Sequence, residues 1–298
     1  MNALNKLKKL GIGTVQFGAK YGISNTLQKP NYKEVNNILK LANRNNISIL
    51  DTAPEYGKSE IKIGRSFSKN FRIITKTAKI NSFKITNIEI DYVYKTFLNS
   101  LKNLKKRKIY ALLIHDFSDL LKPGSEHLVK LIKRLKREGL TDKIGISLYD
   151  IKDTEKVLNF FKPDIIQIPC NIFDQRFIKN EFIFTKYKNI EIHARSVFLQ
   201  GLLLMDEKKI PKFFNPIKEK IIKLQLFLKK NNLTQYEGSL LFMFMQRRIK
   251  YFFIGINRPQ ELLQLIQTIK KIDKEKKLNF QQFAVNESKF INPQEWKL

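Results

Sequence analysis

Residues 10–17 read Leu10-Gly11-Ile12-Gly13-Thr14-Val15-Gln16-Phe17, and residues 48–52 read Ser48-Ile49-Leu50-Asp51-Thr52. Both runs are short and mainly apolar and contain β-branched residues, which is typical of buried strands. The segment between them has apolar residues at the spacing of one helix face: Val35, Ile38, Leu39 and Ala42. Asn31 and Glu34 have the spacing of a capping box that would begin this helix. The sequence therefore opens with a strand, a helix and a second strand.

The same alternation continues along the chain and predicts eight strands. They are Leu10–Phe17, Ser48–Thr52, Arg72–Lys76, Tyr110–His115, Lys143–Ser147, Asp164–Ile168, Ile190–Ser196 and Tyr251–Gly255. Eight strand–helix units in about 260 residues indicate an α/β protein with a (β/α)8 TIM barrel. A doubly wound dinucleotide-binding fold would need G-x-G-x-x-G, and the run from Gly11 lacks the third glycine. We expect one barrel domain over residues 1–298, with two helices near Ile217–Lys230 and Gln235–Arg247 before the last strand.

The composition is that of a globular protein with a large positive charge. The 298 residues include 56 Lys+Arg and 27 Asp+Glu, a formal net charge of +29, and 43% are hydrophobic. This hydrophobic content excludes a disordered chain, and the single cysteine, Cys170, excludes a disulfide scaffold. The apolar run at residues 240–245 is far shorter than the roughly 20 residues that span a bilayer. We expect a cytoplasmic protein without a membrane segment or signal peptide.

The positive charge raises the question of a polyanionic partner. Of the 56 basic residues, 45 are lysine and 11 are arginine, and lysines occur on nearly every predicted helix. Base reading and bidentate phosphate contacts favour arginine, and single-strand binding favours aromatic residues between the charges. We therefore expect solvated helix faces and no nucleic-acid partner, with a polyanion-binding protein as an alternative.

Polar and ionisable residues stand at the ends of several predicted strands. The second strand ends around Asp51, the third at Lys76 and the fourth at His115. The later strands contribute Ser147, Gln167, Arg195 and Ser196. Active sites of (β/α)8 barrels form where the carboxyl ends of the strands meet. We therefore expect a carboxylate, a lysine and an imidazole to converge at one mouth of the barrel.

A set of short motifs extends along nearly the whole chain. In order they are Leu10-Gly11-Ile12-Gly13-Thr14, Asp51-Thr52-Ala53-Pro54-Glu55-Tyr56-Gly57-Lys58-Ser59-Glu60 with Ile63-Gly64, Thr75-Lys76-Thr77, Leu113-Ile114-His115, Lys143-Ile144-Gly145-Ile146-Ser147, the stretch from Gln167 to Asn171, and Phe253-Ile254-Gly255. Together they resemble the motifs of the aldo-keto reductase family, and the decapeptide from Asp51 is the most specific of them. The resemblance implies an NAD(P)H-dependent oxidoreductase that reduces an aldehyde or ketone to the alcohol.

By this resemblance the catalytic residues are Asp51, Tyr56, Lys76 and His115. A tyrosine hydroxyl, with a reference pKa of about 10, is a reluctant acid at neutral pH. A nearby lysine ammonium favours the phenolate and would lower the pKa of Tyr56, and Asp51 would hold Lys76 charged and in place. Tyr56 is then the expected general acid. His115 would donate a hydrogen bond to the substrate oxygen.

The resemblance also implies a nicotinamide site. Ser147 and Gln167 match the residues that hold the carboxamide, but Leu148 stands where the family commonly has Asn. Arg195 stands where many members have a Tyr that stacks on the nicotinamide; it could stack there, contact a cofactor phosphate or bind an anionic substrate. The full predicted cofactor set is Gly13, Thr14, Ser147, Gln167, Arg195, Ser196, Leu199, Gly201, Gly255, Asn257, Arg258 and Glu261, and no metal is expected.

Residues 255–261 match the segment that holds the adenosine 2′-phosphate in this family. Arg258, beside a helix that begins at Pro259, would supply a cation and free N–H groups to that phosphate. Glu261 could instead oppose a phosphate or bind the adenine amine. We expect NADP rather than NAD. Residues 199–202 are expected to wrap the pyrophosphate through backbone N–H groups.

The expected partner is a small-molecule carbonyl compound. Residues 195–201 resemble members of the family associated with bacterial surface-polysaccharide gene clusters, which favours a sugar-derived substrate. An alternative of another class is a cofactor-sensing barrel subunit with very slow chemistry. Cys170 has no base aimed at it and is expected to be a buried thiol, and Trp296 is expected to close the barrel bottom or pack on a helix. Both a monomer and a homo-oligomer are compatible with the sequence.

Overall fold

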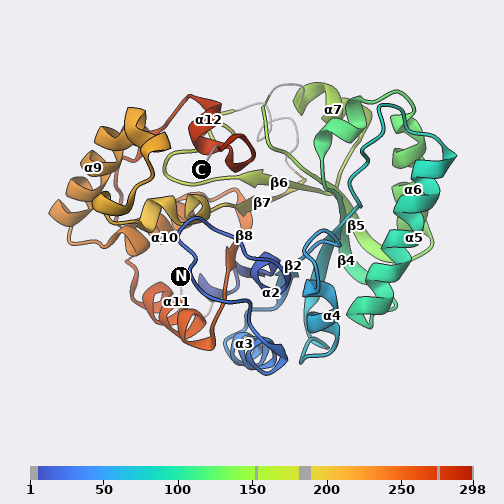
Figure 1. The fold of residues 1–298 in the computed structure, drawn as a ribbon, viewed down its shortest axis with the longest axis horizontal. Helices are drawn as coiled ribbons and strands as arrows, with labels where there is room; N and C mark the ends of the chain where they lie inside the picture. Colours follow the sequence, from blue (N-terminus) through green and yellow to red (C-terminus); the bar gives the residue numbers. More distant parts are fainter. Residues whose placement is uncertain (1–5, 152–153, 181–188, 274–275, 297–298) are drawn as a thin grey trace.

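Eight parallel strands pair in chain order, and the last closes on the first to form a barrel (Figure 1). The strands are β1 Leu10–Gly13, β2 Ile49–Asp51, β3 Arg72–Lys76, β4 Ile109–Ile114, β5 Thr141–Ser147, β6 Ile165–Pro169, β7 Glu191–Arg195 and β8 Ile249–Gly255. The computed structural model describes residues 6–151, 154–180, 189–273 and 276–296, so both ends of the predicted 1–298 domain lie outside the described residues. The predicted (β/α)8 fold is confirmed.

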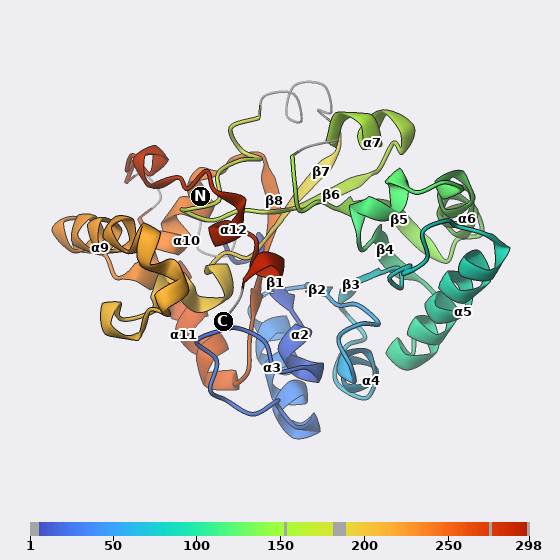
Figure 2. The same ribbon diagram turned by 45° about the horizontal axis from the view of Figure 1, so that its top comes forward.

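Helices surround the barrel and bury one apolar face against it. They are α2 Val15–Gly18, α3 Tyr32–Arg44, α4 Ser59–Gly64, α5 Asn87–Leu104, α6 Ser125–Arg137, α7 Thr154–Phe160, α9 Asn215–Lys230, α10 Gln235–Met245, α11 Pro259–Lys271 and α12 Ser288–Ile291. In both views α9 and α10 lie on the opposite side of the barrel from α5 and α6 (Figures 1 and 2). Within the described ranges, no helix combines the length and the apolar character that a membrane crossing requires.

Most predicted elements agree with the structure to within one or two residues. The capping box at Asn31 and Glu34 begins α3, and the predicted pair of helices before β8 is present as α9 and α10. The first predicted strand was too long, because β1 ends at Gly13 and α2 begins at Val15. The chain turns there because the N–H and hydroxyl of Thr14 both donate to the Asp51 carbonyl oxygen, at 3.0 and 2.9 Å.

The turn after β1 brings the backbone of α2 against the segment that carries Tyr56. A Cβ atom on Gly18 would overlap the Tyr56 carbonyl oxygen, and Gly57, at φ +57°, packs against the Gly18 carbonyl in turn. Glycine is required at both positions, for the close approach at Gly18 and for the left-handed backbone at Gly57. This contact fixes the position of Tyr56 relative to the end of β1.

We predict that Gly18→Ala destabilises the protein by about 2–3 kcal/mol, because the added methyl group forces two backbone segments apart. Gly139→Ala is the matched control. Its φ is +74° but a Cβ there meets nothing within 4 Å, so only the backbone strain of about 1 kcal/mol is expected. Urea denaturation of both variants measures the difference. Equal losses of stability in the two variants would show that Gly18 does not pack tightly against the Tyr56 carbonyl group in solution.

Candidate active site

A cavity of about 730 Å³ opens at the carboxyl ends of the strands. Many of the predicted site residues line it: Gly13, Thr14, Asp51, Tyr56, His115, Arg195, Ser196, Gly201, Gly255, Asn257 and Glu261. The predicted residues outside this lining are Lys76, Ser147, Gln167, Leu199 and Arg258. We call the part beside Tyr56 and His115 the reacting end, and the part beside Asn257 and Glu261 the distal end.

Lys76 lies behind the reacting end with 2% of its surface exposed. Its Nζ donates to Asp51 Oδ2 at 2.8 Å, to the Thr52 carbonyl oxygen at 2.9 Å and to the Tyr56 hydroxyl at 3.3 Å. An ammonium has three N–H donors, so each one has an acceptor. Neighbouring strands β2 and β3 supply Asp51 and Lys76, and the loop after β2 supplies Tyr56.

His115 completes this group, with its ring edge-on to that of Tyr56 and the centroids 6.0 Å apart. Burial lowers the pKa of His115 to about 3, and the charges of Lys76 and Arg195 act in the same direction. The imidazole is therefore neutral at pH 7 and keeps one N–H to donate. The structure thus brings together the predicted residues Asp51, Tyr56, Lys76 and His115.

The pKa of Tyr56 differs from the expectation. Burial of the hydroxyl raises it well above its ordinary value, and the negative charge of Asp51 raises it further. The expected lowering by Lys76 does not prevail, because the ammonium is already neutralised by Asp51 at 2.8 Å. Tyr56 is consequently protonated at neutral pH and holds the proton that an acid must donate.

Ser147 and Gln167 form a polar floor behind the reacting end. Gln167 Nε2 donates to Asp51 Oδ1 at 2.9 Å, which ties β6 to the ion pair. Ser147 Oγ and Gln167 Oε1 are buried, and neither has a hydrogen-bond partner in the part of the chain that the structure describes. A hydroxyl donor beside an amide acceptor complements a primary carboxamide, which has one acceptor and two donors. These residues therefore fit the nicotinamide that the sequence motifs imply.

The segment after β7 does not offer the N–H groups that were predicted for a pyrophosphate. The N–H of Leu199 donates to the Ser196 carbonyl oxygen and that of Gly201 to the Phe198 carbonyl oxygen, both at 2.9 Å. Ser196 and Gln200 have positive φ values of 60° and 53°, so the chain coils tightly here. The turn itself uses both of these donors in this conformation, and the binding of a pyrophosphate by Leu199 and Gly201 stays a prediction.

The backbone N–H groups at the start of α11 are also already hydrogen-bonded within the protein. The Glu261 carboxylate accepts the N–H groups of Asn257 at 2.7 Å and Arg258 at 3.4 Å. The Arg258 guanidinium forms an ion pair with Glu34 at 3.3 Å. The N–H groups that were predicted to be free for a 2′-phosphate are thus bound to a carboxylate, since Glu261 completes a capping box.

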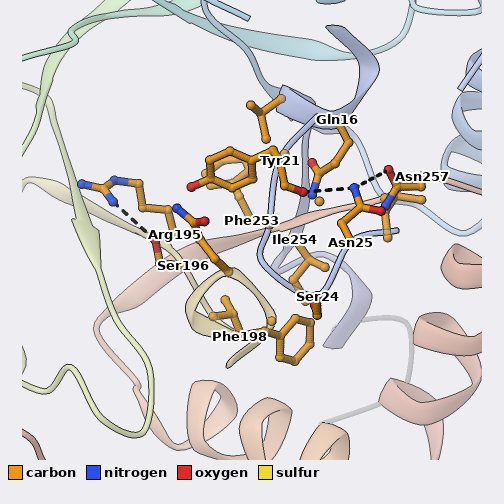
Figure 3. A pocket seen from close by; sticks show the side chains of 18 of the residues that line it. Gln16, Tyr21, Ser24, Asn25, Arg195, Ser196, Phe198, Phe253, Ile254 and Asn257 are labelled. Atoms are coloured by element: carbon orange, nitrogen blue, oxygen red, sulfur yellow. Dashed lines mark hydrogen bonds between the residues drawn. The ribbon is translucent and has the colours of Figure 1, made fainter. Parts of the chain in front are cut away.

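Arg195 extends from the end of β7 toward the loop after β5. Its Nη2 donates to the Leu148 carbonyl oxygen at 2.9 Å, and the guanidinium carbon lies 3.8 Å from the centroid of the Tyr149 ring. Arg195 and Asn257 lie on opposite sides of the cavity (Figure 3). Arg195 therefore belongs to the reacting end.

Sequence reasoning missed several side chains that line the cavity, among them Tyr21, Asn25 and Tyr149. The loop that carries Tyr21 and Asn25 spans the cavity. The Ile23 N–H donates to the Gln200 carbonyl oxygen at 3.0 Å, and Asn25 Nδ2 donates to Asn257 Oδ1 at 3.2 Å. Tyr149 lies two residues beyond the end of β5, so a set of candidate residues that included the two positions after each strand end would have contained it.

Two residues that the sequence left outside the site are indeed structural. Cys170 is buried, and burial raises the pKa of its thiol far above the ordinary range. Trp296 packs edge-on against Phe214 at the start of α9, with the ring centroids 5.0 Å apart. Of the two positions expected for Trp296, packing on a helix is confirmed.

A family model described as the aldo/keto reductase family matches residues 9–285. This chain belongs to the aldo/keto reductase family. Its members are NAD(P)H-dependent oxidoreductases that reduce carbonyl groups. D-arabinose 1-dehydrogenase from Saccharomyces cerevisiae is 28% identical over 131 residues, which are 41% of this chain and 39% of the yeast enzyme. The matched region is therefore about two fifths of that relative's length.

Solved structures of aldo-keto reductases have the same fold. The holo form of an aldo-keto reductase from Bacillus halodurans has a TM-score of 0.71 at 16% identity, covering 93% of this chain and 92% of that chain. An aldo-keto reductase from Pseudomonas aeruginosa has a TM-score of 0.65 at 20% identity, with 89% and 90% covered. The glycerol dehydrogenase from Gluconobacter oxydans has a TM-score of 0.65 at 17% identity, with 89% and 86% covered.

We predict that His115 makes the protein less stable as the pH falls from 7 to 5. The pKa of His115 is about 3 when folded, against about 6.5 in an unfolded chain, so the unfolded state binds more protons between these values. Stability therefore falls with pH in this window, by about 2 kcal/mol for this residue. In His115→Gln, the free energy of unfolding measured by urea denaturation should therefore fall less between pH 7 and pH 5 than it does in the wild type, by this amount. The exposed His127→Gln is the control, and an equal effect in both variants contradicts the prediction.

Proposed function

We propose that this protein reduces an aldehyde or ketone to the alcohol with NADPH. The observation that carries the proposal is the buried Lys76, which contacts both Asp51 and the Tyr56 hydroxyl at the end of a cavity, with a neutral imidazole opposite. This arrangement presents a protonated hydroxyl and a neutral N–H donor to the same small volume.

The residues of the chain supply the proton and the orientation. A bound nicotinamide would deliver hydride to the carbonyl carbon. Tyr56 donates its proton to the carbonyl oxygen as that oxygen gains electron density, and Lys76 stabilises the phenolate that remains. His115 donates a hydrogen bond to the same oxygen and orients the carbonyl. Asp51 keeps Lys76 in position beside Tyr56. Hydride and proton together convert the carbonyl group to the alcohol.

Ser147 and Gln167 are the proposed holders of the nicotinamide ring. Their unpartnered oxygen atoms would bind its carboxamide and fix which face of the ring points to the substrate. Gly255 is a further proposed contact of the cofactor, because it lines the cavity; a Cβ there would overlap the Gln16 side chain.

NADPH rather than NADH is the proposed cofactor. Arg258 at the distal end supplies the cation that a 2′-phosphate requires, while Glu261 holds the adjoining N–H groups. A phosphate must therefore displace the Glu261 carboxylate or bind through Arg258 alone. These two side chains act in opposite directions on the choice between the cofactors.

A sugar-derived carbonyl compound is the proposed type of substrate. The yeast relative is named for a sugar, D-arabinose, and one structural neighbour is named for the polyol glycerol. The cavity offers several neutral hydrogen-bonding side chains to hydroxyl groups: Gln16, Tyr21, Asn25, Tyr149 and Gln200.

Tyr56→Phe is predicted to reduce kcat by about 10²–10⁴-fold, because the substrate oxygen loses its proton donor. The affinity for NADPH should stay within about threefold, since the hydroxyl acts in the chemical step. Stopped-flow hydride transfer and fluorescence titration with NADPH measure the two effects. Tyr92→Phe, an exposed tyrosine on α5, is the control. Turnover retained in Tyr56→Phe overturns the proposed function, and tight NADPH binding without turnover in the wild type indicates a cofactor-sensing subunit.

Arg258→Ala is predicted to weaken NADPH binding at least about tenfold more than NADH binding, because a charged hydrogen bond to phosphate is lost. Glu261→Gln should change the ratio of NADPH affinity to NADH affinity in the opposite direction, in favour of NADPH by about tenfold, because it removes a like charge beside the phosphate. Fluorescence titration with both nucleotides gives the ratio, and Arg247→Ala, exposed before β8, is the control. If Arg258→Ala affects both nucleotides equally, the NADP preference has another origin.

A further inference from the structure

The charges at the reacting end of the cavity do not cancel. Asp51 and Lys76 form an ion pair at 2.8 Å, so together they add no net charge. Burial keeps His115 neutral at pH 7, with a pKa of about 3. Among the described side chains that line the cavity, Arg195 is the only one with a positive charge at this pH. The reacting end therefore has a net positive charge from Arg195.

Neutral groups hold the Arg195 guanidinium in place. Its Nη2 donates to the Leu148 carbonyl oxygen at 2.9 Å, its Nη1 to Ser196 Oγ at 3.4 Å, and its carbon lies 3.8 Å from the Tyr149 ring centroid. Its Nε is buried and has no hydrogen-bond partner within the described ranges. No carboxylate of those ranges lies within 4.0 Å of it as an ion-pair partner. The cation is thus oriented but not neutralised.

Arg195 acts on the groups that would carry out the reaction. Burial is the largest influence on the pKa of Tyr56, of His115 and of Tyr21, and the positive charge of Arg195 lowers all three. Arg195, Tyr56 and His115 also line the same cavity, in which the carbonyl group would bind. An anionic group on the same molecule would therefore come within reach of the guanidinium.

The adenosine phosphate is not the partner of this cation. The residues proposed for that phosphate, Arg258 and Glu261, lie at the distal end, next to Asn257. Arg195 and Asn257 lie on opposite sides of the cavity, with Tyr21 and Phe253 between them (Figure 3). Of the partners considered from the sequence, the nicotinamide ring and a group on the substrate both meet Arg195 at the reacting end, and of these two only an anionic substrate group neutralises its charge.

We propose that Arg195 binds an anionic group of the substrate, so that the enzyme prefers a carboxylate-bearing aldehyde or ketone over its neutral counterpart. This inference rests on the proposed carbonyl reduction at Tyr56. Arginine has five N–H donors, of which Leu148 and Ser196 engage two, so donors remain for a carboxylate. The Tyr149 ring shields one face of the guanidinium from water, which strengthens a charged hydrogen bond.

The test compares 4-carboxybenzaldehyde with its methyl ester, two aldehydes that differ by one charge. The quantity measured is the ratio of kcat/KM for the acid to that for the ester, with NADPH. The wild type should favour the acid, and Arg195→Gln should lower the ratio about thirtyfold or more, because a partly buried charge pair is broken. Arg195→Lys should retain part of the preference, since it keeps the charge without the planar fork.

Arg134→Gln on the exposed face of α6 is the matched control and should leave the ratio unchanged. An unchanged ratio in Arg195→Gln overturns the inference. Equal losses on the acid and the ester also overturn it, because Arg195 would then act on the cofactor or the reacting oxygen. Both results leave the proposed reductase activity intact.

Binding separates a failure of this inference from a failure of the proposed function. If the wild type reduces neither aldehyde, the proposed function is wrong for these probes, and calorimetric titration with benzoate and benzamide in the presence of NADP⁺ tests Arg195 directly. The inference expects tighter binding of benzoate than of benzamide and loss of that difference in Arg195→Gln. Equal binding of the two ligands to the wild type, or no binding of benzoate, overturns it.

Discussion

The geometry of the site depends on one buried cation, the ammonium of Lys76. Moving such a charge out of water costs several kcal/mol, and the cost is offset only when every N–H has a well-placed acceptor. Asp51, the Thr52 carbonyl and the Tyr56 hydroxyl provide these three acceptors. A displacement of any of them leaves part of the charge unpaired. The ion pair therefore holds Tyr56, the proposed acid, in position.

Other parts of the barrel help to keep these acceptors in place, because they form hydrogen bonds with Asp51 and with residues next to it. Asp51 receives Gln167 from β6 through its other carboxylate oxygen, and its carbonyl oxygen receives Thr14 from the end of β1. Ser59 at the start of α4 donates to the Thr14 carbonyl oxygen at 2.9 Å. Three separate segments thus converge on Asp51 and its neighbours. The contact of Gly18 with Tyr56 adds a backbone restraint from the other side.

The sequence predicted the parts of the site that lie on strands, because a strand end is visible as a local pattern. The eight strands, and the meeting of Asp51, Lys76 and His115, follow from that pattern together with the topology of the barrel. The loop with Tyr21 and Asn25 could not be predicted, because its position depends on the left-handed turn at Gln200. The sequence allowed that Glu261 opposes a phosphate, but it did not show that its carboxylate binds the N–H groups at the start of α11, since a capping box and a phosphate site use the same N–H groups.

The two ends of the cavity differ in charge, and this difference connects the composition with the substrate. Arg195 makes the reacting end positive, whereas the Glu261 carboxylate lies at the distal end. The net positive charge at the reacting end therefore attracts a small anion toward Tyr56 and His115, whereas the distal end carries charges of both signs, from Glu261 and Arg258. The net charge of +29 acts in the same direction, because a strongly positive protein draws anions from solution toward its clefts. Lysines on solvated helix faces would thus favour the capture of the anionic substrate proposed for Arg195.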